Sequence, residues 1–214
     1  MFFEQSGPDI QNELKYSLEY RQHQRKILTF LRSNLPEITN KLIKGARSSL
    51  SDFEEDDLTG EINNLLNDKL RESSGYLFRF EAKSGPDILM FVSPYEPFST
   101  PLFVIEAKRL PPTRSKDYIL TGIRRFKTEE HGMQHDIAAM LGYVQDKNFN
   151  YWHDEINLWI EDLIADTAQK PQWEQQDKLN QVRVASYGEY KSIHSRTKKG
   201  PITLHHFWLD FCNN

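Results

Sequence analysis

Two acids and a lysine stand at the ends of neighbouring apolar runs in the stretch "SGPDILMFVSPYEPFSTPLFVIEAKRL". Asp87 begins the first run, and Glu106 and Lys108 close the second. If the two runs pair as strands, the two carboxylates come close together and repel unless a cation or a proton lies between them. A hard divalent ion, Mg²⁺ or Mn²⁺, takes oxygen ligands and keeps waters that can attack a phosphate. Because side chains alternate along a strand, Lys108 shares a face with Glu106 and can polarise such a water.

Three short aromatic or β-branched runs predict the strands that must position these residues. They cover residues 76–82, 87–92 and 101–107 and are separated by Ser-Gly-Pro and by the turn "SPYEPFST", so we expect a meander. Two more strands are predicted in the tail, "QVRVASY" at 181–187 and "PITLHHFWLDF" at 201–211. The second of these is apolar on both faces, which is typical of a central strand.

Apolar spacing predicts helices around these strands. The clearest covers residues 58–70, and two others are expected at 130–145 and at 152–168, the last ended by Pro171. The face of the first helix is formed by Leu58, Ile62, Leu65, Leu66 and Leu70. The chain is therefore expected to combine strands and helices.

The N-terminal fifty residues are more polar. Asp9 is expected to cap a helix that begins at Ile10 and is interrupted by Pro36, and residues 36–49 are expected to form a second helix. We therefore predict an N-terminal helical hairpin that lies on the core or on a partner. Residues 1–50 would be an extension, and residues 51–214 the main domain.

The order of these elements resembles the PD-(D/E)xK nuclease superfamily, which has the restriction-endonuclease-like fold. The match consists of "GPD" at 85–87 and "EAK" at 106–108 after a strand-length gap, with an acidic helix upstream. The resemblance covers about residues 55–145. It implies an α/β fold, with a central mixed β-sheet flanked by helices, and a metal-dependent phosphodiesterase site.

The resemblance also implies roles for individual residues. Asp87 and Glu106 would be metal ligands, the backbone carbonyl of Ala107 a third, and Lys108 a catalytic residue. Glu61 matches the acid that the upstream helix often contributes in this superfamily, although an acid near a helix start also favours the helix dipole. For Asp87, Glu106 and Lys108 the alternative is a surface hairpin with a charged rim.

The same triplets occur a second time in the chain without the surrounding elements. "GPDI" at 7–10 is followed by a polar helical stretch, so Asp9 is interpreted as a helix cap. "EAK" at 81–83 precedes Asp87 too closely to lie on a partner strand, so Glu81 and Lys83 are interpreted as a strand end. Neither triplet alone predicts a site.

Basic residues follow the "EAK" motif. Residues 108–127 contain seven bases and one acid, Asp117. Beyond Lys108, the bases are Arg109, Arg114, Lys116, Arg124, Arg125 and Lys127, which would lie beside the scissile phosphate and position the nucleic-acid backbone. Gln134, on the margin of the predicted 130–145 helix, would reach the site or be solvated.

Other candidates for nucleic-acid contact have plain structural alternatives. Tyr118 and Phe126 would stack on unpaired bases or anchor the loop in the core. The stretch "HSRTKKG" at 194–200, with Lys191 before it, would touch phosphates or form a polar turn between strands.

Composition limits the class of protein. The chain has 214 residues, a net charge of -4 and one cysteine, Cys212, which excludes an intramolecular disulfide framework and a zinc site built on several thiolates. We expect a reducing compartment, the cytoplasm, and no insertion in a membrane. The predicted function is a Mg²⁺- or Mn²⁺-dependent DNA endonuclease of a restriction or anti-phage defence system, with a partner subunit or as a homodimer. The alternative is a non-catalytic interaction module that kept the fold.

Overall fold

The computed structural model describes residues 8–45, 53–71, 76–80, 85–92, 101–111, 113 and 115–212. These residues form a seven-stranded sheet with the order β1-β2-β3-β4-β7-β6-β5. The strands are β1 (Tyr76–Phe80), β2 (Ile88–Val92), β3 (Phe103–Leu110), β4 (Ile137–Val144), β5 (Asn180–Val184), β6 (Gly188–His194) and β7 (Ile202–Asp210). The central strands β3, β4 and β7 are parallel, and the outer pairs are antiparallel. The predicted α/β class with a mixed sheet is confirmed, as is the β1-β2-β3 meander.

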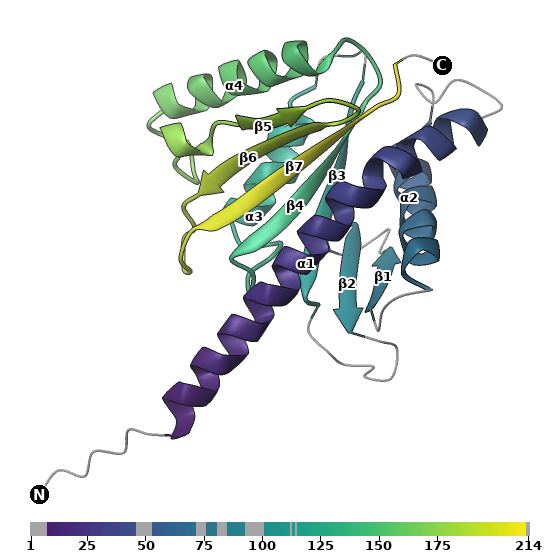
Figure 1. The fold of residues 1–214 in the computed structure, drawn as a ribbon. Coiled ribbons are helices and arrows are strands. Elements are labelled where there is room, and N and C mark those ends of the chain that lie inside the picture. Colours follow the sequence, from purple (N-terminus) through teal and green to yellow (C-terminus); the bar gives the residue numbers. More distant parts are fainter. Residues whose placement is uncertain are drawn as a thin grey trace, which may run out of the picture.

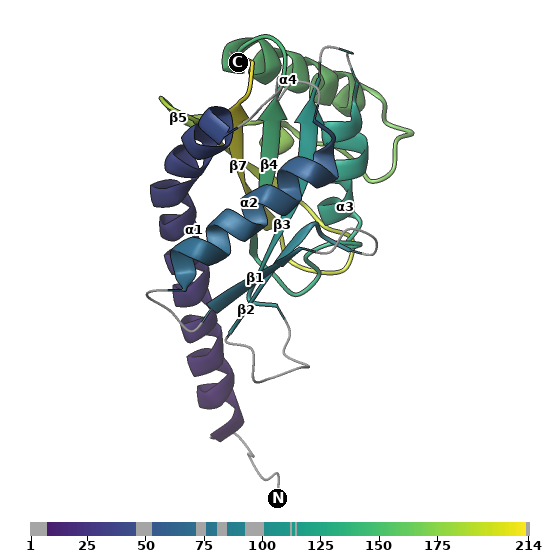
Figure 2. The ribbon, with the colours of Figure 1, turned by 90° about the vertical axis from the view of Figure 1, so that its right-hand side faces the viewer.

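Helices cover both faces of this sheet (Figure 1). They are α1 (Pro8–Gly45), α2 (Glu55–Leu70), the short helical segment η2 (Tyr118–Ile123), which continues into α3 (Arg124–Lys127), α4 (Phe149–Ala165) and the single turn η3 (Gln175–Asp177). The view of Figure 2 shows α1 and α2 on one face, with α3 and α4 on the other. Two hydrophobic cores follow from this arrangement, one on each side of the sheet.

The N-terminal segment is one helix rather than the predicted hairpin. Helix α1 runs through Pro36 without a break. Proline removes a backbone hydrogen bond from a helix interior, but Leu31, Leu35 and Ile38 lie on both sides of it and are buried against the sheet and α2. The packing of this continuous apolar stripe therefore outweighs the free energy lost with the missing hydrogen bond at Pro36. Because α1 already begins at Pro8, Asp9 lies inside the helix and is not its cap.

Polar contacts fix the middle of α1 on the sheet. Arg32 pairs with the buried carboxylate of Glu189 on β6, with 2.7 Å between Nη2 and Oε1. The amide of Gln24 donates to the carbonyl of Ile137 at the start of β4. Further toward the N-terminus, Tyr20 contacts His135 and Arg21 pairs with Asp136. The part of α1 before Tyr20 projects away from the body of the protein (Figure 1).

The prediction of a helix over residues 130–145 is wrong, because residues 137–144 form strand β4. This strand lies between β3 and β7 and is buried on both faces, so its apolar run lacks the alternation of a half-buried strand and also fits a helical spacing. Gly142 marks the close packing here, since a Cβ at this position would overlap the ring of Trp208 on β7. Residues 131–134, expected inside the helix, precede the strand as a turn.

The C-terminal strands are partly predicted. β7 is central and buried on both faces, as its sequence indicated. The expected strand at 181–187 is shorter, β5, and the segment after it forms β6, which the sequence analysis did not predict. The predicted helix at 152–168 corresponds to α4, and the turn at 93–100 and the second "EAK" at 81–83 lie outside the described residues.

Candidate functional site

The strands β2 and β3 separate after a short antiparallel ladder that covers three residues of each. Beyond it, β3 is paired with β4 on one side only. The backbone N–H groups of Ala107 and Arg109 donate instead to side chains, to Asp87 Oδ2 at 2.6 Å and to Glu55 Oε2 at 3.0 Å. Two carboxylates thus complete the open edge of the strand, which satisfies backbone groups that would otherwise be costly to bury.

The ammonium group of Lys108 lies at the centre of the same edge. Four oxygen atoms surround its Nζ, at 2.7 Å for Glu55 Oε1, 2.7 Å for the Ala107 carbonyl, 3.0 Å for Glu106 Oε1 and 3.9 Å for Asp87 Oδ2. Burial alone would lower the pKa of Lys108, but the neighbouring carboxylates, first of all Glu106, raise it above its usual value. The lysine therefore stays protonated and acts as an internal cation.

Glu106 is completely buried and has cationic or polar neighbours on both oxygens. Arg125 Nη1 lies 3.0 Å from Oε1. His131 Nδ1 lies 3.0 Å from Oε2, although its ring N–H does not point squarely at that oxygen. Burial would raise the pKa of Glu106, but His131 and Lys108 outweigh it and hold the pKa below its usual value. Glu106 is therefore an ionised carboxylate.

Asp87 is the carboxyl group of this cluster whose ionised form is disfavoured. Burial and, next, the charge of Glu106 raise the pKa of its carboxyl to about 7, despite the opposing effects of Lys108 and the Ala107 N–H. An additional cation next to Asp87 would stabilise the ionised form of its carboxyl group.

In metal-free protein, Asp87→Asn is expected to raise the stability at pH 8 and to have a smaller effect at pH 5. Unfolded Asp87 titrates near pH 4, as a model aspartate does. Its folded pKa is about 7, so the stability contributed by this group falls as the pH rises between these values. Asparagine keeps an oxygen for the Ala107 N–H. Urea unfolding in EDTA at both pH values measures the difference, and an equal effect at the two would contradict it.

The acid that α2 contributes to this cluster is Glu55 and not Glu61. Glu55 is the first residue of α2, where the helix end reaches the open edge of β3. Glu61 lies six residues further, about 9 Å along the axis and on another side of the helix, and its side chain is exposed. The structure therefore brings Asp87, Glu106, Ala107 and Lys108 together but does not bring Glu61 to them.

The predicted phosphate-contact residues are dispersed. Arg125 contacts Glu106 and is partly exposed, and Arg124, on α3, is half-buried.

The other predicted bases lie elsewhere and have acidic partners. Arg109 pairs with Glu54, and Lys116 lies 3.7 Å from Asp162 on α4. Arg114 lies outside the described residues.

Lys127 cannot contact nucleic acid as predicted, because its side chain is completely buried in an ion pair with Asp177. Tyr118 and Phe126 are also fully buried, so they anchor η2 and α3 in the core and cannot stack on bases. Gln134 is exposed in the turn before β4 and not on a helix.

Sequence reasoning missed Glu55 and His131 as members of the site. Glu55 belongs to the run of acids at residues 52–57, and its position as the first residue of the helix is the signal that distinguishes it from its neighbours. His131 lies in the turn between α3 and β4, beside Gly132, which has a positive φ of 64°. Because a helix was predicted over residues 130–145, this turn, and with it the position of His131, was not predicted.

The donor set at this edge fits a hard divalent cation that keeps several waters. Two carboxylates, Asp87 and Glu106, and the carbonyl of Ala107 face one point, and Mg²⁺ is typically held by one or two carboxylates. Within the described part of the chain, no three Asp, Glu, His or Cys side chains are placed to hold a metal ion by themselves. The carbonyl is therefore a necessary member of the set, and Lys108 Nζ occupies the point where these oxygens converge.

No family model, curated protein or solved structure matches this chain. Among the helices in the described ranges, none is long and apolar enough to cross a membrane.

Proposed function

We propose that this protein is a metal-dependent nuclease with a restriction-endonuclease-like core. The observation that carries the proposal is the convergence of four oxygens on one cationic group at the point where β2 and β3 separate. Three carboxylates, those of Glu55, Asp87 and Glu106, share this point with two permanent cations, Lys108 and Arg125. When all three carboxylates are ionised they outnumber these two cations by one charge, which favours a further cation once Lys108 moves aside.

The residues of the site would divide the work as follows. Asp87, Glu106 and the carbonyl of Ala107 would hold Mg²⁺ or Mn²⁺, which when bound supplies an activated water and offsets charge on a phosphate. Lys108 would turn from the carboxylates toward the phosphate and offset the charge that develops there. Glu55 would keep the edge of β3 in place through the Arg109 N–H. His131 would help to keep Glu106 ionised, and Arg125 would pair with the same carboxylate.

DNA is the proposed substrate, because most members of the superfamily that the sequence resembles act on DNA. Arg124 and Arg125 are partly exposed bases of α3, and Arg125 contacts Glu106. They would contact backbone phosphates without reading sequence. A nuclease without a sequence-reading element must be restrained, so we propose a partner subunit, as in restriction or anti-phage defence systems. The projecting end of α1 is the proposed surface for it (Figure 1).

A second candidate function, a non-catalytic interaction module, is favoured by a specific feature of the same site. Asp87 and Glu55 satisfy backbone N–H groups, and Lys108 neutralises them. Such a network would also stabilise the open edge of a strand that has no catalytic role. The two functions differ in their need for metal.

Metal-dependent cleavage distinguishes them. We expect the wild-type protein to cut plasmid or linear DNA with Mg²⁺ or Mn²⁺ and not with EDTA. Glu106→Gln and Lys108→Met should abolish cleavage, since each removes a group at the reacting centre. The matched control is Glu61→Gln, an equal change of charge on the exposed side of α2, which should retain activity.

Cleavage that persists in EDTA, or in both site variants, would overturn the assignment of the site. If the wild-type protein cuts neither DNA nor RNA with either metal, the interaction module is the better description.

A further inference from the structure

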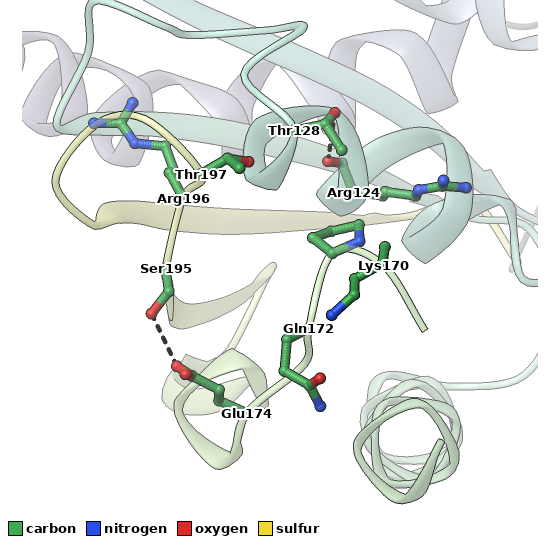
Figure 3. Close-up of a pocket in the computed structure, with 9 residues that line it drawn as sticks. Arg124, Thr128, Lys170, Gln172, Glu174, Ser195, Arg196 and Thr197 are labelled. Carbon is green, nitrogen blue, oxygen red and sulfur yellow. Dashed lines mark hydrogen bonds between the residues drawn. The ribbon is translucent and has the colours of Figure 1, made fainter. Parts of the chain in front are cut away.

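An open pocket of about 470 Å³ lies on the α3 face of the sheet (Figure 3). Its walls come from three segments that are distant in the sequence: α3, residues 170–174, and the turn that follows β6. The last of these is the "HSRTKKG" stretch. The pocket is larger than a single phosphate group requires and falls in the size range of small-molecule sites.

Two cationic side chains line the pocket without a carboxylate partner in the described part of the chain. They are Arg124, from α3, and Lys170. Other partly exposed bases have such a partner, as Arg109 has in Glu54 and Lys178 in Glu161. The guanidinium of Arg124 extends away from Ser195 and Glu174, whereas the ammonium of Lys170 points toward Gln172 (Figure 3). The two unpaired charges therefore create a positive field along one edge of the pocket, which favours an anion.

The third base of the pocket wall serves the fold and not a ligand. The guanidinium of Arg196 turns away from the pocket (Figure 3) and donates to the carbonyls of Gly132 and His135. This contact holds the turn after β6 in position, so the backbone of Ser195 and Thr197 forms a fixed wall. Asp136 Oδ1 lies 3.9 Å from Nη2 of Arg196 and offsets its charge, so the positive field of the pocket depends on Arg124 and Lys170.

The single acid of the pocket is already engaged. Glu174 accepts hydrogen bonds from Ser195 Oγ at 2.9 Å and from Gln176 Nε2 at 2.6 Å. These donors are neutral, so the carboxylate keeps its charge, but within the described residues it forms no ion pair with Arg124 or Lys170. Two cations against one acid leave the lining with a net positive charge. The remaining lining includes the ring of Pro171 and the amide of Gln172, an apolar surface and a hydrogen-bonding group next to the two cations.

We propose that this pocket binds one nucleotide unit, with its phosphate on Arg124 and Lys170 and its base against Pro171 and Gln172. A cationic end and an apolar, hydrogen-bonding end in one cavity match the two ends of a nucleotide. The source is a nucleotide of the nucleic-acid strand at the nuclease site, an assignment that rests on the proposed function. Arg125 contacts Glu106 while its neighbour Arg124 lines the pocket, so a strand that follows α3 connects the two.

Binding measured in EDTA tests the pocket separately from cleavage. The probes are a short labelled single-stranded oligodeoxynucleotide, dAMP and inorganic phosphate, each titrated into wild-type protein and into Arg124→Met/Lys170→Met. Loss of both charge-assisted contacts should weaken oligonucleotide binding about tenfold or more and reduce the salt slope by about 0.7 for each phosphate contact. The matched control is Lys191→Met, an exposed lysine on β6 outside the pocket.

Each outcome decides the proposal. Weaker oligonucleotide binding by the double variant alone supports a strand in the pocket, and weaker dAMP binding supports a pocket that also takes free nucleotides. Equal affinities of the double variant and Lys191→Met for every probe would overturn it. Because no metal is present, loss of binding in the double variant supports the pocket even if Glu106-dependent cleavage is never found.

Discussion

Asp177→Ala is expected to lower the free energy of unfolding by about 3–5 kcal/mol, because it leaves a buried ammonium without its carboxylate. Lys127 and Asp177 are both completely buried, and Nζ lies 2.8 and 2.7 Å from the two carboxylate oxygens. Asp177 also accepts from the Glu174 N–H at 2.7 Å. At roughly 2–4 °C for each kcal/mol in a chain of this size, the melting temperature should fall by roughly 6–20 °C.

The control for this prediction removes both charges. Asp177→Asn/Lys127→Met leaves no buried ion, so it should recover part of the stability that Asp177→Ala loses. Chemical unfolding of the three proteins measures the recovery. A double variant as unstable as Asp177→Ala would show that the loss comes from the shape of the site and not from the unpaired ammonium.

Asp177 is also the end of a buried hydrogen-bond chain, which explains why its loss should be felt widely. The chain runs through Trp208, Tyr118, His206, Ser192, His194 and Asp177, with donor–acceptor distances between 2.5 and 2.9 Å. Burial lowers the pKa of His194 and of His206, so both rings are neutral. With neutral rings, one direction satisfies every group: each member donates to the next, from the Trp208 indole to the Asp177 carboxylate.

The order Ser192, His194 and Asp177 resembles a hydrolase triad, but its environment excludes that use. A catalytic serine must reach a substrate carbonyl, and all three side chains are buried in the core. The chain instead ties η2, η3, β6 and β7 together under α3. It thereby holds α3, which carries Arg125 to the candidate site.

The secondary structure was predictable where the apolar residues follow a single period. It was not predictable where an element is buried on all sides. Helix α2 has a single apolar face, and its predicted position agrees with the structure. Strand β4 is apolar on both faces, so its Met140, Leu141 and Val144 also fit a helical spacing. In α1, the proline rule predicted a break, but the packing of Leu31 and Leu35 against the sheet, a long-range effect, decided the outcome.

The candidate site was predictable in the part that lies on neighbouring strands. Pairing of β2 with β3 brings Asp87 to Glu106 and Lys108, and alternation along β3 puts the last two on one face. Glu55 and His131 reach the same point from segments whose placement depends on tertiary packing. No spacing rule relates such residues to the motif.

Lys108→Met should destabilise the metal-free protein by about 3–5 kcal/mol, since it removes the cation shared by three buried or half-buried carboxylates. Methionine keeps the unbranched stem, which packs near Gly122, so the change in volume is small. The largest loss is expected above pH 7, where Asp87, with a pKa of about 7, is ionised. Below that pH a proton on Asp87 relieves part of the repulsion.

Mn²⁺ is expected to restore much of this stability, because the oxygens that faced Nζ are then free to hold a metal. A ligand that binds only the folded state stabilises it by about 2.7 kcal/mol at a hundredfold excess over its Kd. In the wild-type protein Lys108 competes for the same point, so its Mn²⁺-dependent rise in melting temperature should be smaller. The control Lys108→Met/Asp87→Asn lacks one ligand and should respond weakly. If Lys108→Met is as stable as wild type in EDTA, or if Mn²⁺ raises its melting temperature no more than that of the double variant, these oxygens do not form a cation site.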